Sequence, residues 1–121
     1  MIRIEAPLNP VPFCRPAQNG KRRFNNARYT EFKDELRFFA LNAMGKREPL
    51  KGAVRIRVQF YRRKPKKLTS RMWGDVDNHL KSVLDALNGI CYEDDSQVVE
   101  VTGRKCHGEP RVLIELEELK C

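Results

Sequence analysis

Residues 74–99, GDVDNHLKSVLDALNGICYEDDSQVV, hold an acidic loop, an amphipathic helix and a second acidic loop in direct succession. The chain around this segment is basic, with 24 Lys and Arg against 16 Asp and Glu in 121 residues. Carboxylates this dense repel one another, and a bound divalent cation removes that conflict. The pattern therefore predicts a magnesium site. Five carboxylates lie at the two ends of the segment: Asp75, Asp77, Glu93, Asp94 and Asp95.

The residues between the two acidic clusters have helical spacing. Leu80, Val83, Leu84 and Leu87 fall on one face, and Gly89 is a natural stop. A lone Asp77 before such a helix is also a good N-cap. Capping explains one carboxylate and leaves the other four unexplained.

Magnesium prefers hard oxygen ligands and keeps positions for water and phosphate. Asp75, Asp77 and one or both of Asp94 and Asp95 supply enough ligands for one or two ions. Lys81 lies one helical turn after Asp77, where it can orient the carboxylates or offset charge on the phosphorane. The plain alternative for Lys81 is an i,i+4 ion pair with Asp77 or Asp85.

The helix restricts how the two acidic clusters meet. Asp77 to Asn88 spans about 18 Å at 1.5 Å per residue. Gly89 to Asp95, fully extended, reverses roughly 20 Å, so one chain assembles the site only if this segment runs straight back along the helix. The alternative is that Asp94 or Asp95 comes from a partner subunit.

The amino-acid composition and net charge indicate what kind of partner, location and metal to expect. A net charge of +8 and a pI of about 9.6 favour nucleic acid as the partner. No apolar run approaches the roughly 20 residues that span a bilayer, so we expect no membrane partner and a cytoplasmic location. The four scattered cysteines form no C-x-x-C pair, and Cys106-His107 has no ligand spacing around it, so no zinc is expected.

The remaining elements predict one α+β domain over residues 1–121 in the order β-α-β-α-β-β, with a mixed sheet and two main helices packed on it. Strands are expected at 2–6, from Gly52 to Tyr61, at 97–105 and at 111–117, and residues 106–110 are interpreted as a hairpin turn. A helix is expected from Tyr29 to Met44, with Phe38 and Leu41 off its apolar stripe as a second core face or, preferably, a dimer contact.

Two basic segments flank the acidic motif. Prolines in residues 7–28 predict an extended arm, and residues 61–73 form a basic loop that leads into Asp75. Each charge run can also be a solvated loop, but the adjacency to the carboxylates favours nucleic-acid contact. The candidate contacts are Arg15, Lys21, Arg22, Arg23, Arg62, Arg63, Lys64, Lys66, Lys67 and Arg71.

The pieces Asp75-Val-Asp77-Asn-His-Leu-Lys81, Leu84-Asp-Ala-Leu87 and Asp94-Asp-Ser-Gln-Val-Val99 together resemble the RusA family of Holliday junction resolvases. The family pattern is D-x-D-N-x-x-K, a helix with D-A-L, and D-D-x-Q-V-V. The resemblance implies a homodimeric, Mg²⁺-dependent endonuclease that cuts branched DNA with paired symmetric nicks. It implies catalytic roles for Asp75, Asp77, Asp95 and Lys81, with Asp94 in support.

Other residues of the motif have no matched role. His79 is interpreted as a helix-surface residue, and Trp73 as loop packing or as a base-stacking residue. Two other functions stay open on sequence grounds. One is a nuclease for flaps or other DNA branches, and the other is a non-catalytic nucleic-acid-binding module whose acids are caps and surface charge.

Overall fold

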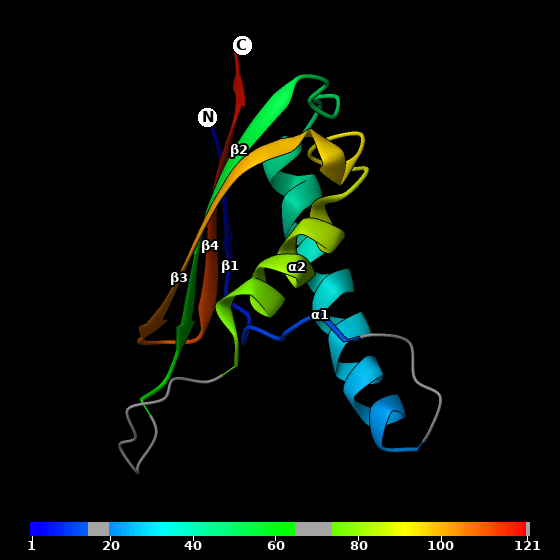
Figure 1. The fold of residues 1–121 in the computed structure, drawn as a ribbon, viewed down its shortest axis with the longest axis vertical. Helices are drawn as coiled ribbons and strands as arrows, with labels where there is room; N and C mark the ends of the chain where they lie inside the picture. Colours follow the sequence, from blue (N-terminus) through cyan, green and yellow to red (C-terminus); the bar gives the residue numbers. More distant parts are fainter. Residues whose placement is uncertain (15–19, 65–73, 121) are drawn as a thin grey trace.

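The structure, a computed structural model, describes residues 1–14, 20–64 and 74–120, with the backbone alone at 20–26. Its elements follow the predicted order of strands and helices, with one short 3₁₀ helix added before the third strand (Figure 1). They are β1 (Ile2–Ala6), α1 (Gly20–Met44), β2 (Ala53–Arg62), α2 (Val76–Leu87), η1 (Asp95–Gln97), β3 (Val98–His107) and β4 (Arg111–Leu119).

The four strands form one mixed sheet in the order β1-β4-β2-β3. β4 pairs antiparallel with both β1 and β2, whereas β3 runs parallel to β2. Both helices cover the same face of this sheet (Figure 1). The predicted α+β class, element order and mixed sheet are confirmed.

The hairpin interpretation of residues 106–110 is wrong. β3 and β4 are separated in the sheet by β2, and the connection between them crosses the end of β2, where the Gly108 N–H donates to the Arg62 carbonyl at 2.8 Å. β2 occupies an inner position in the sheet, and its alternate residues Val54, Ile56, Val58 and Phe60 are all buried.

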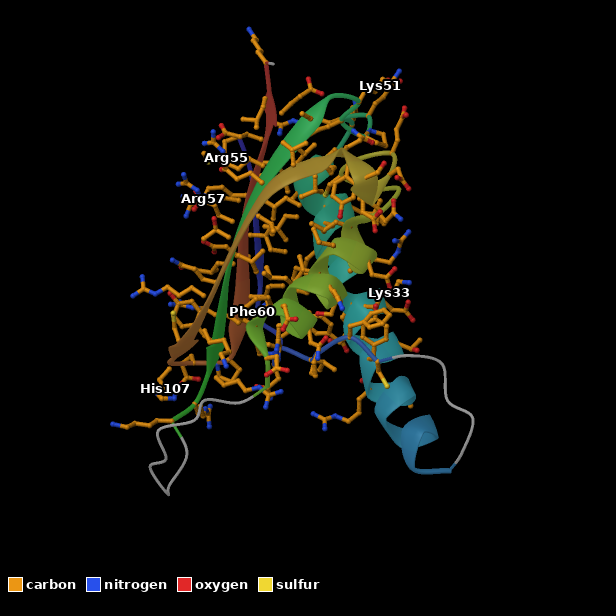
Figure 2. All side chains as sticks on the ribbon, viewed as in Figure 1. Lys33, Lys51, Arg55, Arg57, Phe60 and His107 are labelled. Atoms are coloured by element: carbon orange, nitrogen blue, oxygen red, sulfur yellow. The ribbon has the colours of Figure 1, made fainter. Side chains whose placement is uncertain are left out.

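The two faces of the sheet have opposite chemistry. Phe60 points toward α2, whereas Arg55 and Arg57 point to the solvent face (Figure 2). The alternation in β4 matches it, since Val112, Ile114 and Leu116 are buried as predicted. The hydrophobic core therefore lies between the sheet and the two helices.

Helix α1 is longer than predicted, because it begins at Gly20 and not at Tyr29. The expected extended arm over 7–28 is wrong from Gly20 onward, since the last proline of the segment is Pro16 and nothing after it forbids helix. Phe38 and Leu41 are 59% and 57% exposed, so among the described residues they form no second core face. No helix in the described ranges has the length and apolar character needed to cross a membrane.

A polar clamp joins α1 to α2. Asp85 accepts a short hydrogen bond from the Tyr29 hydroxyl and pairs with Lys33 at 3.0 Å. Burial raises the pKa of the Asp85 carboxyl, but the bonds from Tyr29 and Lys33 outweigh it and hold that pKa below its usual value. The carboxylate therefore stabilises the contact between the helices.

Replacing Asp85 with Asn should lower the free energy of unfolding at pH 7 by about 1 kcal/mol, because the half-exposed ion pair is screened by solvent. The pKa of Asp85 in the folded protein is lower than the ordinary carboxyl pKa of 3.8. The stabilisation is therefore present above pH 3.8 and is lost as the pH falls through the folded-state pKa. Urea denaturation at pH 7 and pH 3 checks this. Asp34→Asn, at an exposed position of α1, is the control, and an equal effect of both substitutions would contradict the clamp.

Candidate active site

The first acidic segment leads into α2 through Gly74, a position where a side chain would be strained. Gly74 has a left-handed φ of 58°, and a Cβ placed on it would lie 2.5 Å from His79 Cε1. The Lys105 ammonium, near the end of β3, donates to the Gly74 carbonyl at 2.6 Å. This turn therefore fixes the start of α2 against the C-terminal end of β3.

His79 is buried, so its interpretation as a helix-surface residue is wrong. Only 1% of the residue is exposed, and its ring packs edge-on against Phe60 with 5.3 Å between centroids. Its Nδ1 lies 3.0 Å from the Asp75 carbonyl oxygen. Burial lowers the pKa of His79, so the ring acts as a neutral wedge between α2 and β2.

Replacing Gly74 with Ala should displace His79 and destabilise the fold by roughly 2 kcal/mol or more, because backbone strain and a steric clash add. Gly45→Ala is a matched control, since Gly45 has a φ of 57° but open space around its Cα. Thermal denaturation of both variants separates the two contributions. Equal losses of stability would show that the His79 contact is unimportant.

Asp75 and Asp77 present free carboxylates at the start of α2. Asp75 occupies the N-cap position, yet its side chain makes no capping hydrogen bond, and the structure gives Asp77 no cap role. Both side chains are exposed, and neither forms a salt bridge within the described residues. Two unengaged carboxylates two residues apart suit a hard divalent cation.

Lys81 is exposed on the same side of α2 as Asp77. The plain alternative of an ion pair with Asp85 is not seen, because Asp85 pairs with Lys33. No salt bridge in the described parts of the chain involves Lys81. Its ammonium is therefore available to a ligand bound at Asp77.

Asp94 and Asp95, the second acidic pair, differ in what they contact. Asp94 caps η1, accepting from the Ser96 N–H at 3.0 Å and from the Ser96 hydroxyl, while Gln97 Oε1 accepts from the Asp94 N–H at 2.8 Å. The hydrogen bonds from Ser96 lower the pKa of Asp94. Asp95 is the exposed first residue of η1. Asp94 therefore has a structural partner set, and Asp95 is the freer ligand.

The chain does not bring the two acidic clusters together. After α2, the segment folds onto residue 50, where Tyr92 bridges to Leu50 and the Gln97 amide donates to the Leu50 carbonyl at 2.8 Å. Asp95 therefore stays at the C-terminal end of α2, about 18 Å from its start. The length of β3 gives a similar separation between the two acidic clusters, since Val98 to Lys105 spans roughly 23 Å. In the described ranges no three Asp, Glu, His or Cys side chains come together as a metal site.

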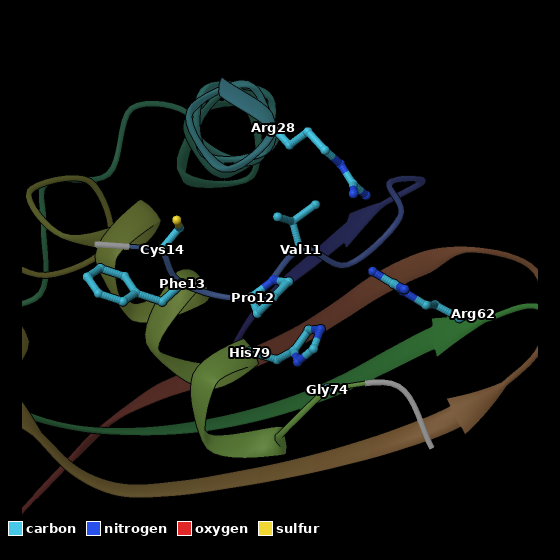
Figure 3. Close-up of a pocket in the computed structure, with 8 residues that line it drawn as sticks. All are labelled: Val11, Pro12, Phe13, Cys14, Arg28, Arg62, Gly74 and His79. Atoms are coloured by element: carbon cyan, nitrogen blue, oxygen red, sulfur yellow. The ribbon is translucent and has the colours of Figure 1, made fainter. Parts of the chain in front are cut away.

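A cationic pocket of about 330 Å³ adjoins the first acidic segment (Figure 3). Arg28 from α1 and Arg62 from the end of β2 point toward each other across it, with His79 and Gly74 on its wall. Arg62 also donates to the Pro10 carbonyl at 2.5 Å. Burial and the positive charge of Arg28 lower the pKa of Arg62. Two like charges held in one hollow favour an anion between them.

The predicted nucleic-acid contacts are only partly placed by the structure. Arg62 lines the pocket as a strand residue, Arg63 pairs with Glu109 at 3.1 Å, and Lys64 is exposed beside them. The first turns of α1 include three of the predicted residues, which are helical and not part of an extended arm. The candidates outside the described residues are Arg15, Lys66, Lys67 and Arg71, and Trp73 is outside them too. The three on α1 are Lys21, Arg22 and Arg23.

Three residues near the site were not predicted from sequence. Arg28 lies in the segment 7–28 that was expected to be a basic arm and is not among the candidate contacts, and Lys105 is the last residue of the strand expected at 97–105. His79 carried the one available signal, because it lies in the motif next to the apolar positions that α2 buries. The other two depend on strand and helix placement that the sequence does not encode locally.

Comparison with known proteins shows the family of the chain. The family model described as "Endodeoxyribonuclease RusA" matches residues 7–117. The chain belongs to the RusA family. This RusA-family chain is also similar to the "Uncharacterized protein YqaN" of Bacillus subtilis (strain 168), with 50% identity over 46 residues. That match covers 37% of the chain and 32% of YqaN.

Proposed function

We propose that the protein is a structure-specific endodeoxyribonuclease that resolves Holliday junctions by Mg²⁺-dependent phosphodiester hydrolysis, with paired symmetric nicks made by a homodimer. Membership of the RusA family supports the reaction class. The observation that carries the proposal for this chain is the pair of unengaged carboxylates, Asp75 and Asp77, beside a pocket lined by two arginines.

Asp75 and Asp77 would hold the magnesium, with Asp95 of the partner subunit as a further ligand, because the Asp95 of the same chain lies about 18 Å away. Asp94 would hold η1 in shape. A bound Mg²⁺ activates water and stabilises the leaving oxygen of a phosphodiester. Lys81, one turn from Asp77, offsets charge that accumulates on the phosphate oxygens. Lys105 fixes the Gly74 carbonyl, and through it the direction of the Asp75 backbone.

The cationic pocket supplies the position of the DNA backbone. Arg28 and Arg62 would bind a phosphate close to the one that is cut, because both guanidinium groups face the hollow beside Gly74. Arg63 and Lys64 continue the positive charge along the same end of the molecule. Such contacts position a duplex arm without reading its sequence.

Replacing Asp75 with Asn should abolish cleavage of a synthetic four-way junction in Mg²⁺, while junction binding in Ca²⁺ is retained or strengthened. The substitution removes one ligand charge at an exposed site and leaves the fold intact. Gel assays on junction, flap and linear duplex measure the outcome. Unchanged junction cleavage would overturn the assignment of the site, and preferential flap cutting would move the substrate to another DNA branch.

Replacing Arg62 with Ala should weaken junction binding about tenfold and reduce the slope of log affinity against log salt concentration by about one. Arg47→Ala is the control, because it removes an equal exposed charge near residue 50, at the opposite end of β2. Fluorescence anisotropy at several salt concentrations measures both variants. Equal effects would show that net charge, and not the pocket, binds the DNA.

A further inference from the structure

One side of helix α1 is uncovered and carries an apolar patch. Phe38 and Leu41, one turn apart, are both more than half exposed. Gly45 continues the same side seven residues after Phe38, and a Cβ added to it would meet nothing within 4 Å among the described residues. Single exposed apolar residues are common on protein surfaces, whereas adjacent ones on one side of a helix form a patch that suits a protein partner.

The turns of α1 before this patch are acidic. Glu31, Asp34 and Glu35 are exposed on the same side of the helix as Phe38. No salt bridge in the described parts of the chain involves any of the three. Because the chain as a whole has a net charge of +8, this cluster is a local exception. Carboxylates repel a DNA backbone, so this side of α1 is unsuited to nucleic acid.

The turn that follows α1 is basic. Lys46 and Arg47 are exposed there, and together they outnumber the exposed Glu48. The uncovered side therefore has three parts in chain order, which are acidic turns, an apolar centre and a basic end. We call this surface the α1 face, and its residues are Glu31, Asp34, Glu35, Phe38, Leu41 and Lys46.

The α1 face is complementary to itself when two copies run antiparallel. A twofold axis midway between Phe38 and Leu41 places the Phe38 of one copy against the partner's Leu41. Asp34 lies four residues before Phe38, and Lys46 lies five residues after Leu41. The same axis therefore sets Asp34 level with the partner's Lys46 to within one residue, or about 1.5 Å along the helix. Apolar side chains meet at the centre, and opposite charges meet at both ends.

We infer that a second copy of this chain docks antiparallel on the α1 face, with the twofold axis between Phe38 and Leu41, and that this contact joins dimers into larger assemblies. The docking is argued from the α1 face alone. For the number of chains in the assembly, the inference rests on the homodimer of the proposed function.

The α1 face is separate from the candidate active site. α1 contacts α2 through Tyr29, Lys33 and Arg37, none of which belongs to the α1 face. In the two-helix layer over the sheet, α1 packs on β1 and α2 packs on β3, which are the two opposite edge strands (Figure 1). A copy docked on the α1 face therefore leaves the acidic segments at the ends of α2 uncovered.

The contact through the α1 face is small. Its apolar centre has two side chains from each copy, which is well short of a standard interface of roughly 1,600 Å². We therefore expect it to form at high protein concentration, or between dimers held on one DNA molecule, where the effective concentration is high. The charge pairs at its ends are exposed, so added salt should weaken the association.

Sedimentation over a range of protein concentrations tests the docking. We expect wild-type protein to form assemblies of more than two chains as its concentration rises. Leu41→Glu should weaken this association at least tenfold, because it buries an unpaired charge at the centre of the contact. Its melting temperature at low concentration should equal that of wild type, since Leu41 is exposed. Wild-type protein that stays at two chains at every concentration, or a variant that associates equally well, would overturn the inference.

A charge exchange tests the position of the axis. Lys46→Glu and Asp34→Lys should each weaken the association about threefold, because each places like charges opposite one another at both ends of the contact. The double variant should associate like wild type, because each pair again joins opposite charges. The two single substitutions change the net charge in opposite directions, so a general charge effect would not weaken both. A double variant weaker than either single one would contradict the axis between Phe38 and Leu41.

Junction cleavage separates failure of this inference from failure of the proposed function. Leu41→Glu should cleave like wild type at protein concentrations where only two chains associate. Wild-type protein that forms the larger assemblies but cleaves no junction in Mg²⁺ would refute the nuclease function and uphold the docking. Two chains for wild type and one for Leu41→Glu, at the highest concentrations, would uphold the docking of α1 faces and refute the homodimer of the proposed function.

Discussion

Helix α2 is a rigid spacer that keeps two acidic segments about 18 Å apart, and the arrangement of the candidate active site depends on this separation. Its N-terminus is fixed by Gly74, whose missing side chain admits His79, and by the bond from Lys105. Its C-terminus is fixed where Tyr92 donates to the Leu84 carbonyl at 2.6 Å. Because both ends are held, the acids cannot approach one another by bending of the helix.

The fold also gathers positive charge at one end of this spacer. β2 ends at Arg62, α2 begins nearby, and Arg28 reaches across from α1 (Figure 3). The segment that carries the free carboxylates and the two guanidinium groups thus lie at the same end of α2. Phosphodiester chemistry needs this combination of ligands for a cation and donors for a phosphate. The opposite end of α2 carries Asp95, with Asp94 committed to capping.

Much of the fold was predictable from the sequence because the apolar periodicity of β2, α2 and β4 is regular. The beginning of α1 was not, since the basic stretch after Gly20 has no apolar stripe of its own. The prediction of a hairpin between β3 and β4 was wrong, because turn residues indicate that the chain reverses but not which strand β4 pairs with. Likewise, the motif identified the acidic residues, whereas their separation depends on where the chain goes after Asn88.

The most direct test is the kinetic order of junction cleavage with respect to protein concentration. A site shared between two copies predicts that the rate of Mg²⁺-dependent junction cleavage, at protein concentrations below the dimer dissociation constant, rises with the square of protein concentration. The rate should become linear once the dimer is saturated. A rate that stays linear in protein down to the lowest concentrations, where sedimentation shows only monomers, would mean that one chain contains a complete active site and would contradict the account.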